Sequence, residues 1–152
     1  MELQPVTAQN WKALIKLKVG DDQTHFVASN LYSIAEAQFG FEDEGHWDFY
    51  PFGAYMDGQP VGFVMYCFNF GHSRFQAFIM RLMVDQQFQG KGHGREIMQL
   101  VLERFREDER IKNVGISYEP ENEVARKLYA SLGFVEPGET LDGETLAVLK
   151  LR

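Results

Sequence analysis

Three glycines at alternate positions, Gly90, Gly92 and Gly94, constrain the fold of this chain more than any other feature. They stand between a strand-like apolar run, residues 74–84, and a helical repeat of apolar residues over 97–105. A strand that enters a helix through such a loop exposes successive backbone N–H groups where the helix dipole favours an anion. The loop therefore predicts a phosphate cradle. It lacks the Gly-Lys-Ser/Thr of a P-loop and the GxGxxG spacing of a dinucleotide fold.

The rest of the chain alternates between strand and helix patterns. We expect strands over 2–6, 51–56, 61–70, 74–84, 113–118, 134–135 and 146–151. We expect helices over 11–17 behind a Thr7 cap, over 26–39 before Gly40, over 97–105 and over 122–132. An acidic aromatic loop is expected over 41–50, and Asp57-Gly58 and Asp142-Gly143 predict hairpin turns. These elements predict one α/β domain over residues 1–152, with a mixed, mostly antiparallel sheet of six to seven strands and about four helices.

Composition excludes several classes of protein. A chain of 152 residues with 45% hydrophobic residues is too apolar for disorder, and its longest apolar stretch, 61–70, is too short for a membrane span. The N-terminus lacks a secretory pattern, so we expect a cytoplasmic protein without a membrane partner. A single cysteine, Cys67, permits no internal disulfide and no cysteine zinc site, and we expect no metal.

The charge is unevenly distributed. The net charge of −7 argues against nucleic acid as a partner, because phosphate neutralisation needs a basic face. No lysine or arginine occurs between Val19 and Ser73, and most of the aromatic residues lie between Phe26 and Phe78. This segment is either a solvated acidic surface over an aromatic core or a cleft for a cationic ligand, with carboxylates for charge and rings for cation–π contact.

A second motif completes a recognisable pair. Gln89, Gly92 and Gly94 fit the pattern Gln/Arg-x-x-Gly-x-Gly/Ala, and residues 122–134 fit Asn-x-x-Ala-x-x-x-Tyr-x-x-x-Gly-Phe. In this order and about 30 residues apart, the two motifs resemble the GNAT superfamily of N-acetyltransferases. Residues 51–66 and 142–144 look most like bacterial spermine/spermidine acetyltransferases. The resemblance covers nearly the whole chain.

The resemblance implies acetyl-CoA as co-substrate and assigns residues to it. The backbone around Leu82 to Val84 would pair with the pantetheine arm, the loop from Gln89 to Arg95 would hold the pyrophosphate, and Asn122 would bond the pantetheine. Arg126, with Lys127, would reach the adenosine phosphates, unless both belong to a solvated helix face. The implied cofactor-binding residues are Leu82, Met83, Val84, Gln89, Gly90, Lys91, Gly92, His93, Gly94, Arg95, Asn122 and Arg126.

Tyr129 is the implied catalytic residue. It lies seven residues after Asn122, so both share a helix face. Its role would be general acid to the departing thiolate during direct attack in a ternary complex, and the alternative is a half-buried core tyrosine. A primary amine of pKa ~10.4 is almost entirely protonated at pH 7, so a base or a water chain must first remove a proton. Strand N–H groups near Met83 would meet the oxyanion.

The position of the general base differs between this chain and the family that it resembles. Polyamine acetyltransferases of this kind often carry an acid where this chain has Met80, followed by Arg81. We therefore expect the base and the substrate-binding groups among other acids, with His46 and His72 as weaker candidates. The candidate acids are Glu36, Glu42, Asp43, Glu44, Asp48 and Glu119.

The sequence leads to one function and three alternatives. The expected function is acetyl transfer from acetyl-CoA to a small polycationic amine such as spermidine or spermine. Because relatives in the family that the chain resembles are commonly dimers, we also expect a homodimer. The alternatives are a peptide or protein amine as acceptor, an aminoglycoside as acceptor, and a non-catalytic acyl-CoA-binding module.

Overall fold

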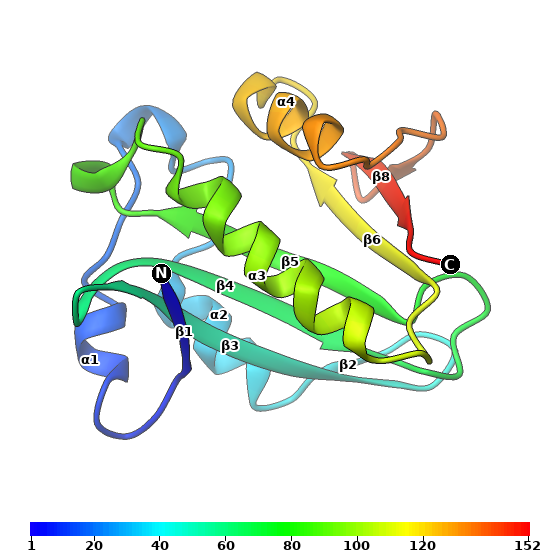
Figure 1. Cartoon of the computed structure of the whole chain (residues 1–152), viewed down its shortest axis with the longest axis horizontal. Helices are drawn as coiled ribbons and strands as arrows, with labels where there is room; N and C mark the ends of the chain where they lie inside the picture. The colour runs from blue at the N-terminus through cyan, green and yellow to red at the C-terminus, as the bar shows by residue number, and fades with distance from the viewer.

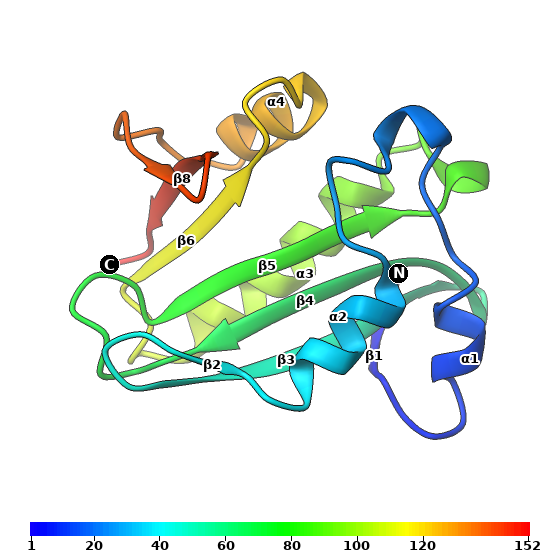
Figure 2. The same ribbon diagram turned by 180° about the vertical axis from the view of Figure 1, so that it is seen from behind.

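The computed structural model describes residues 1–152, which form an eight-stranded sheet with helices on both faces (Figure 1). The strands are β1 (Glu2–Pro5), β2 (Phe41–Glu42), β3 (His46–Met56), β4 (Gln59–Phe68), β5 (Ala77–Val84), β6 (Asn113–Tyr118), β7 (Thr140–Leu141) and β8 (Glu144–Lys150). The helices are α1 (Trp11–Leu14), α2 (Asn30–Ala37), α3 (His93–Glu107) and α4 (Glu123–Ser131). Helices α3 and α4 lie on one side of the sheet, and Figure 2 shows α2 crossing the other.

The predicted mixed, mostly antiparallel sheet is confirmed. Its order is β1-β3-β4-β5-β6-β8-β7, with β2 paired to β3 off this path. Every pairing is antiparallel except that of β5 with β6. The sheet has eight strands instead of six to seven, because β2 and β7 are two-residue strands too short to give a periodic signal. The expected strand over 134–135 is absent, and Val135 forms only an isolated bridge with Val148.

Both predicted hairpin turns are present. Asp57 and Gly58 have φ of 50° and 77°, and Asp142 and Gly143 have φ of 47° and 84°. Positive φ at both central residues matches the right-handed twist of the flanking strands, which is why Asp-Gly is favoured there. The first turn joins β3 to β4, and the second joins β7 to β8.

The expectation of a loop over residues 41–50 is wrong. The segment forms β2 and the first half of β3, with Phe41 paired to Trp47. Trp47 and Phe49 are buried, whereas Asp48 and Tyr50 are exposed. This alternation is the period of a half-buried strand, and the many charges of the segment obscured it. The correction makes β3 an eleven-residue strand.

Several element boundaries also differ from those expected. Helix α1 is a single turn with Asn10 as its N-cap in place of Thr7, and the second helix begins after a Ser29 cap that accepts a hydrogen bond from the Tyr32 N–H. β5 starts at Ala77 rather than at residue 74, because residues before it turn back on Asn69. No helix combines the length and hydropathy that a bilayer crossing requires.

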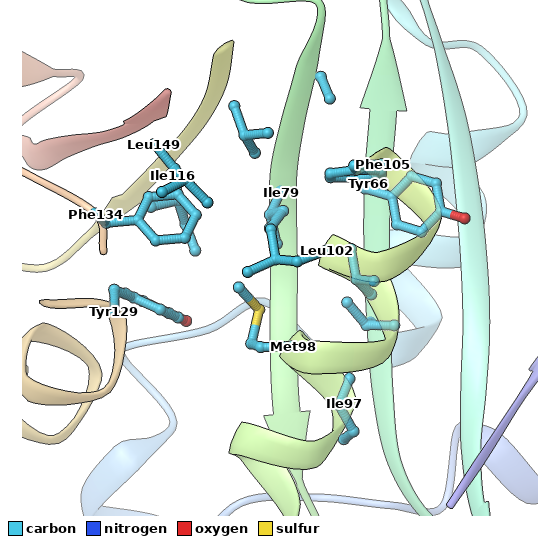
Figure 3. Packing of buried hydrophobic residues seen from close by; sticks show 14 of the residues in the cluster. Tyr66, Ile79, Ile97, Met98, Leu102, Phe105, Ile116, Tyr129, Phe134 and Leu149 are labelled. Carbon is cyan, nitrogen blue, oxygen red and sulfur yellow. The ribbon is translucent and has the colours of Figure 1, made fainter. Parts of the chain in front are cut away.

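Each face of the sheet carries an apolar cluster. Under α3 the cluster contains Ile97, Leu102 and Phe105 of the helix and Ile79 of β5 (Figure 3). On the α2 face a second cluster contains Trp47 and buried side chains of β4 and β5. Burial of each such side chain stabilises the fold by roughly 1.5–3 kcal/mol. The two clusters hold β5 from both sides and so fix the strand beside which the candidate site opens.

Candidate active site at a fork in the sheet

The parallel strands β5 and β6 pair over only three residues. The paired residues are Ala77 with Val114, Phe78 with Gly115 and Ile79 with Ile116. Both strands continue, to Val84 and Tyr118, without further pairing. Figure 2 shows the two strands meeting at one end and diverging towards the end where α4 begins. The fork leaves backbone groups of β5 facing an opening instead of a neighbouring strand.

A β-bulge lies where the fork opens. In the pairing of β4 with β5, Met65 faces Arg81 and Tyr66 faces Ile79, so Met80 is an extra residue on β5. Ile79 and Leu82 pack with the α3-face cluster, and Met80 packs with the α2-face cluster. Arg81 reaches α2 as well, which means that the bulge turns two consecutive side chains to the same face.

A cleft of about 1590 Å³ passes through the fork. One part is lined by the free edge of β5, the loop before α3 and the first turns of α4. The other part is lined by α2, the N-terminal end of β3 and the segment before α2. The cleft therefore joins the helix terminus on the α3 side to the acidic aromatic residues on the α2 side, with β5 between them.

The glycine loop presents backbone N–H groups to this cleft. Gly90 and Gly92 have φ of 78° and 83°, and Gly92 is the N-cap of α3 without a side-chain cap. A Cβ added at either glycine would meet no atom within 4 Å. A larger side chain there would thus project into open space beside the first turn of a fifteen-residue helix. Free N–H groups and the helix dipole make this terminus suited to an anion.

Ten of the twelve expected cofactor-binding residues line the cleft. They are Leu82, Met83, Val84, Gln89, Gly90, Gly92, His93, Gly94, Arg95 and Asn122. Lys91 and Arg126 lie outside its lining. The Arg126 guanidinium is held by Glu123 and Glu136, with a distance of 2.9 Å from Nε to the Glu136 carboxylate. Arg126 is therefore occupied by an ion-pair network, whereas Lys127 on the same helix does line the cleft.

Several of these polar side chains are engaged within the protein. Gln89 donates to Gln23 and to the carbonyl of Val84, both at 2.9 Å. Arg95 donates to the Ser131 hydroxyl, and the Asn122 side chain accepts from the Ala125 N–H as the cap of α4. These bonds fix the loop and the start of α4, which leaves the backbone N–H groups of the loop as its free donors.

Tyr129 of α4 stands at the inner wall of the cleft. Its side chain is buried, and its ring reaches from α4 towards Met98 of α3 (Figure 3). Burial, and to a smaller degree the neighbouring Tyr118, raises the pKa of Tyr129. Its hydroxyl makes no hydrogen bond within the protein. A neutral phenol with a free O–H group is a proton donor available to a ligand.

Tyr118 is a contrasting neighbour. The two rings lie 5.4 Å apart, yet the Tyr118 hydroxyl donates to Glu136 at 2.5 Å. Burial and this bond to a carboxylate raise the pKa of Tyr118 to about 12. Its proton is thus committed to Glu136, and Tyr129 is the tyrosine whose proton remains free.

Two of the six expected acidic residues line the cleft. Glu36 and Asp43 do so, and Glu42, Glu44, Asp48 and Glu119 lie outside it. Glu36 of α2 accepts from Arg81 at 3.2 Å. The Arg81 Nη1 donates to the carbonyl of Met80, and its buried Nε has no partner. The α2 side of the cleft accordingly holds an internal ion pair with one donor unused.

The two candidate histidines have defined partners. His46 is exposed and contacts Glu42 and Asp48. His72 is buried, and its Nδ1 accepts from the backbone N–H groups of Arg74 and Phe75. A neutral ring then carries its proton on Nε2, which lies 3.2 Å from both Asp43 and Glu44. This tautomer ties the β2–β3 connection to the β4–β5 loop and leaves no ring lone pair for a metal ion.

The structure adds a pair that the sequence did not reveal. Ser117 of β6 donates to Glu144 of β8 at 2.7 Å, and both line the cleft. Each is partly buried. The only sequence signal for Ser117 is that it is a polar residue within the apolar pattern of β6. No local pattern connects it to Glu144, which lies 27 positions later. Their contact depends on the register of β6 against β8.

Two curated relatives that match this chain over its full length are named as N-acetyltransferases of polyamines. One relative is the spermine/spermidine N(1)-acetyltransferase of Bacillus subtilis (strain 168), which is 27% identical over 156 residues that cover 99% of each chain. A probable spermine N(1)-acetyltransferase of Bacillus subtilis subsp. natto (strain BEST195) matches to the same identity and coverage.

Solved structures agree with the fold. An aminoglycoside acetyltransferase in complex with coenzyme A has a TM-score of 0.73 and 17% identity, over 97% of this chain and 93% of that one. The spermidine N-acetyltransferase from Vibrio cholerae, in complex with CoA and spermine, has a TM-score of 0.71 and 16% identity, over 99% and 95%. A family model described as the acetyltransferase (GNAT) family matches residues 11–134. The chain therefore belongs to the GNAT family of acetyltransferases.

Proposed function

We propose that this protein transfers an acetyl group from acetyl-CoA to a primary amine of a small polycation such as spermidine or spermine. The observation that carries the proposal is the cleft itself, which joins a phosphate-suited helix terminus to an acidic aromatic surface through the fork between β5 and β6. Similarity over the full length to a spermine/spermidine N(1)-acetyltransferase supports the choice of acceptor.

The donor half fits acetyl-CoA in three ways. The open space at Gly90 and Gly92 admits a pyrophosphate next to the N–H groups of α3. The free edge of β5 over 80–84 can pair with an extended pantetheine arm, as an added strand would. Lys127 at the cleft adds a positive charge on the α4 side. Lys91 and Arg126, which lie outside the cleft lining, are not needed for this arrangement.

Transfer requires three events at the fork. The acceptor ammonium loses a proton, because a primary amine of pKa ~10.4 is charged at pH 7 and has no lone pair with which to attack. The neutral nitrogen attacks the thioester carbonyl carbon, and N–H groups of β5 near Met83 stabilise the oxyanion. The C–S bond breaks and Tyr129 protonates the thiolate. Placement matters most in this last step, because the raised pKa of Tyr129 makes it a weak acid in the free protein.

The acceptor half suits a polyamine. Glu36 and Asp43 supply carboxylates inside the cleft, and Phe41, Trp47 and Phe49 line the same part. Carboxylates can bind the ammonium groups, and the rings can pack against the methylenes between them. Glu42, Glu44 and Asp48 contribute only to the charge around the entrance.

One observation favours a second acceptor class. The Arg81 guanidinium lines the α2 half of the cleft and has more N–H donors than its bonds to Met80 and Glu36 use, so it could donate to an oxygen of the acceptor, and a polyamine has none. A peptide amine or an aminoglycoside would supply such an oxygen.

One assay separates these possibilities. Thiol release from acetyl-CoA is measured across polyamines, peptides and aminoglycosides, with Tyr129→Phe as the matched inactive control. Transfer to polyamines supports the proposal. If the protein prefers an oxygen-bearing acceptor and this preference decreases in Arg81→Gln, the result supports a peptide amine or an aminoglycoside as the acceptor. Coenzyme A binding without transfer to any amine would identify a non-catalytic module.

A further inference from the structure

Ser117 occupies the first position of β6 beyond the last pair of the fork. That pair is Ile79 with Ile116, so Met80 and Ser117 are the next residues on the two strands. Met80 is also the bulged residue of β5. An amine that reaches a thioester held along β5 would come between these two positions. Met80 has no proton acceptor to offer, and Ser117 does.

Ser117 faces the acceptor half of the cleft. Its neighbours Ile116 and Tyr118 belong to the α3-face cluster, so strand alternation directs Ser117 to the α2 face. Its partner in the register of β6 and β8 is Leu146, which belongs to the α2-face cluster. Glu144 lies two residues before Leu146 and therefore points to the same face. Tyr129 approaches the fork from the opposite, α3 face.

The two carboxylates that the sequence suggested as base and that line the cleft are otherwise occupied. Glu36 is paired with Arg81, and Asp43 lies 3.2 Å from the Nε2 of His72. Glu144 instead accepts a hydrogen bond from Ser117, whose oxygen keeps lone pairs for a further donor. A hydroxyl bonded to a carboxylate is an arrangement that can pass a proton onward.

We propose that Ser117 and Glu144 form a relay that removes the proton from the acceptor ammonium. The inference rests on the proposed amine acetylation and supplies the base that is missing at Met80. The ammonium N–H donates to the Ser117 Oγ. As that proton moves to Oγ, the hydroxyl proton moves to the Glu144 carboxylate. The products are a neutral amine, an unchanged serine and a neutral Glu144 carboxylic acid.

The later proton transfers balance this step. The neutral amine attacks the thioester carbon, Tyr129 gives its proton to the departing thiolate, and the second nitrogen proton restores Tyr129 through water. Glu144 returns its proton to solvent after product release. The sum is one ammonium and one thioester converted to one amide, one thiol and one released proton. Ser117 is the group that touches the substrate, and Glu144 acts through it.

Other ionisable groups line the cleft and contribute to any pH dependence. They are Asp22, His25, Glu36, Asp43, Arg81, His93, Arg95, Glu121, Glu123, Lys127 and Asp142. A matched control is Asp57, an exposed carboxylate in the β3–β4 turn that does not line the cleft. Asn tolerates its φ of 50°, so Asp57→Asn removes the same charge without strain.

The test is the pH profile of kcat/KM for spermidine in wild type, Glu144→Gln, Ser117→Ala and Asp57→Asn. Glu144→Gln keeps an oxygen for the Ser117 hydrogen bond but cannot take a proton. We expect both relay variants to lose roughly 10²-fold or more at pH 7, the usual scale of base catalysis. The loss should shrink as pH rises towards the pKa of the amine, ~10.4, because free amine then becomes abundant. Asp57→Asn should retain the wild-type profile.

A second acceptor separates proton removal from structure. In an analogue of the polyamine whose reacting amine is replaced by an alkoxyamine, the reacting nitrogen is neutral at pH 7 while the other amines keep their charge. The relay variants should therefore acetylate this analogue at nearly the wild-type rate. An equal loss for both acceptors at every pH, or a wild-type profile in Glu144→Gln, overturns the relay while leaving the acetyltransferase proposal standing. A wild-type protein that acetylates no amine overturns the proposed function and the relay together.

Discussion

Ile79 of β5 and Ile116 of β6 are the last residues that pair across the parallel step of the sheet, and beyond them the two strands separate around the cleft. Both side chains are buried in the cluster under α3 (Figure 3). The pair fixes the point of separation, so Met80, Ser117 and the free edge of β5 have defined positions around it. The reaction proposed above takes place within a few residues of this point.

The glycine loop can be tested with a substitution that has a built-in control. Gly92→Glu should abolish acetyl-CoA binding, because a carboxylate would enter the space beside the N–H groups of α3. Its positive φ adds roughly 1–2 kcal/mol of strain. Gly58→Glu has a similar φ of 77° and open surroundings in the distant β3–β4 turn. Calorimetry should show wild-type affinity for Gly58→Glu, and undiminished affinity in folded Gly92→Glu would remove the cradle.

Tyr129→Phe should lower turnover by roughly 10²- to 10⁴-fold with little change in acetyl-CoA affinity, because only one hydroxyl is removed. Tyr118→Phe is the matched control. It removes the hydroxyl that donates to Glu136, and the loss of this hydrogen bond should cost about 1 kcal/mol of stability. Its turnover should stay near that of wild type. Steady-state kinetics of the two variants side by side decide the matter, and equal turnover in both would make Tyr129 structural.

Glu36→Gln should raise KM for spermidine and leave KM for acetyl-CoA unchanged. The substitution removes a cleft carboxylate and also leaves the Arg81 guanidinium without its partner, which repels a polycation. The double variant Glu36→Gln/Arg81→Gln should recover part of the loss. Glu42→Gln serves as control, because Glu42 lies outside the cleft. Matching effects of Glu36→Gln and Glu42→Gln would reduce the acidic segment to a general electrostatic surface, one that salt screens.

Acid stability should depend on Asp108. The Arg110 guanidinium donates to both oxygens of this carboxylate and lowers the pKa of Asp108 to about 2. A pKa lowered in the folded state contributes stability above the ordinary value of 3.8, and this contribution is lost as pH falls towards 2. Urea unfolding between pH 5 and pH 2 should thus show a flatter decline in Asp108→Asn than in wild type. Asp57→Asn, which removes an exposed turn carboxylate, should decline as wild type does.

Local signals were sufficient for much of the fold. Asp57-Gly58 specifies a turn with two positive φ values, and Asn122 is the cap of α4 because its side chain accepts an N–H bond three residues later. The prediction for residues 41–50 was wrong because their high content of charged residues is typical of a loop and obscured the strand alternation. Its strands are defined by the pairing of β2 with β3 and, from Asp48 onward, of β3 with β4, and local composition does not report such pairing.

The candidate site likewise has features that the sequence predicts and features that it does not. The glycine loop and Tyr129 follow from motifs, since their geometry is set within one loop and one helix. The bulge at Met80 and the bond from Ser117 to Glu144 depend on the register of three different strands. A one-residue change in either register would send these side chains to the other face, so a linear pattern could not place them.

The three-residue pairing between β5 and β6 also determines how the two halves of the sheet are connected. The sheet consists of two antiparallel ribbons, β1-β3-β4-β5 and β6-β8-β7, that are joined along the backbone by this short seam and held together elsewhere by side chains. In the proposed complex the pantetheine arm of acetyl-CoA lies along the unpaired part of β5. It continues the hydrogen-bonded ladder beyond the point where β6 separates from β5. The molecule that is consumed in the reaction is then also a temporary part of the sheet.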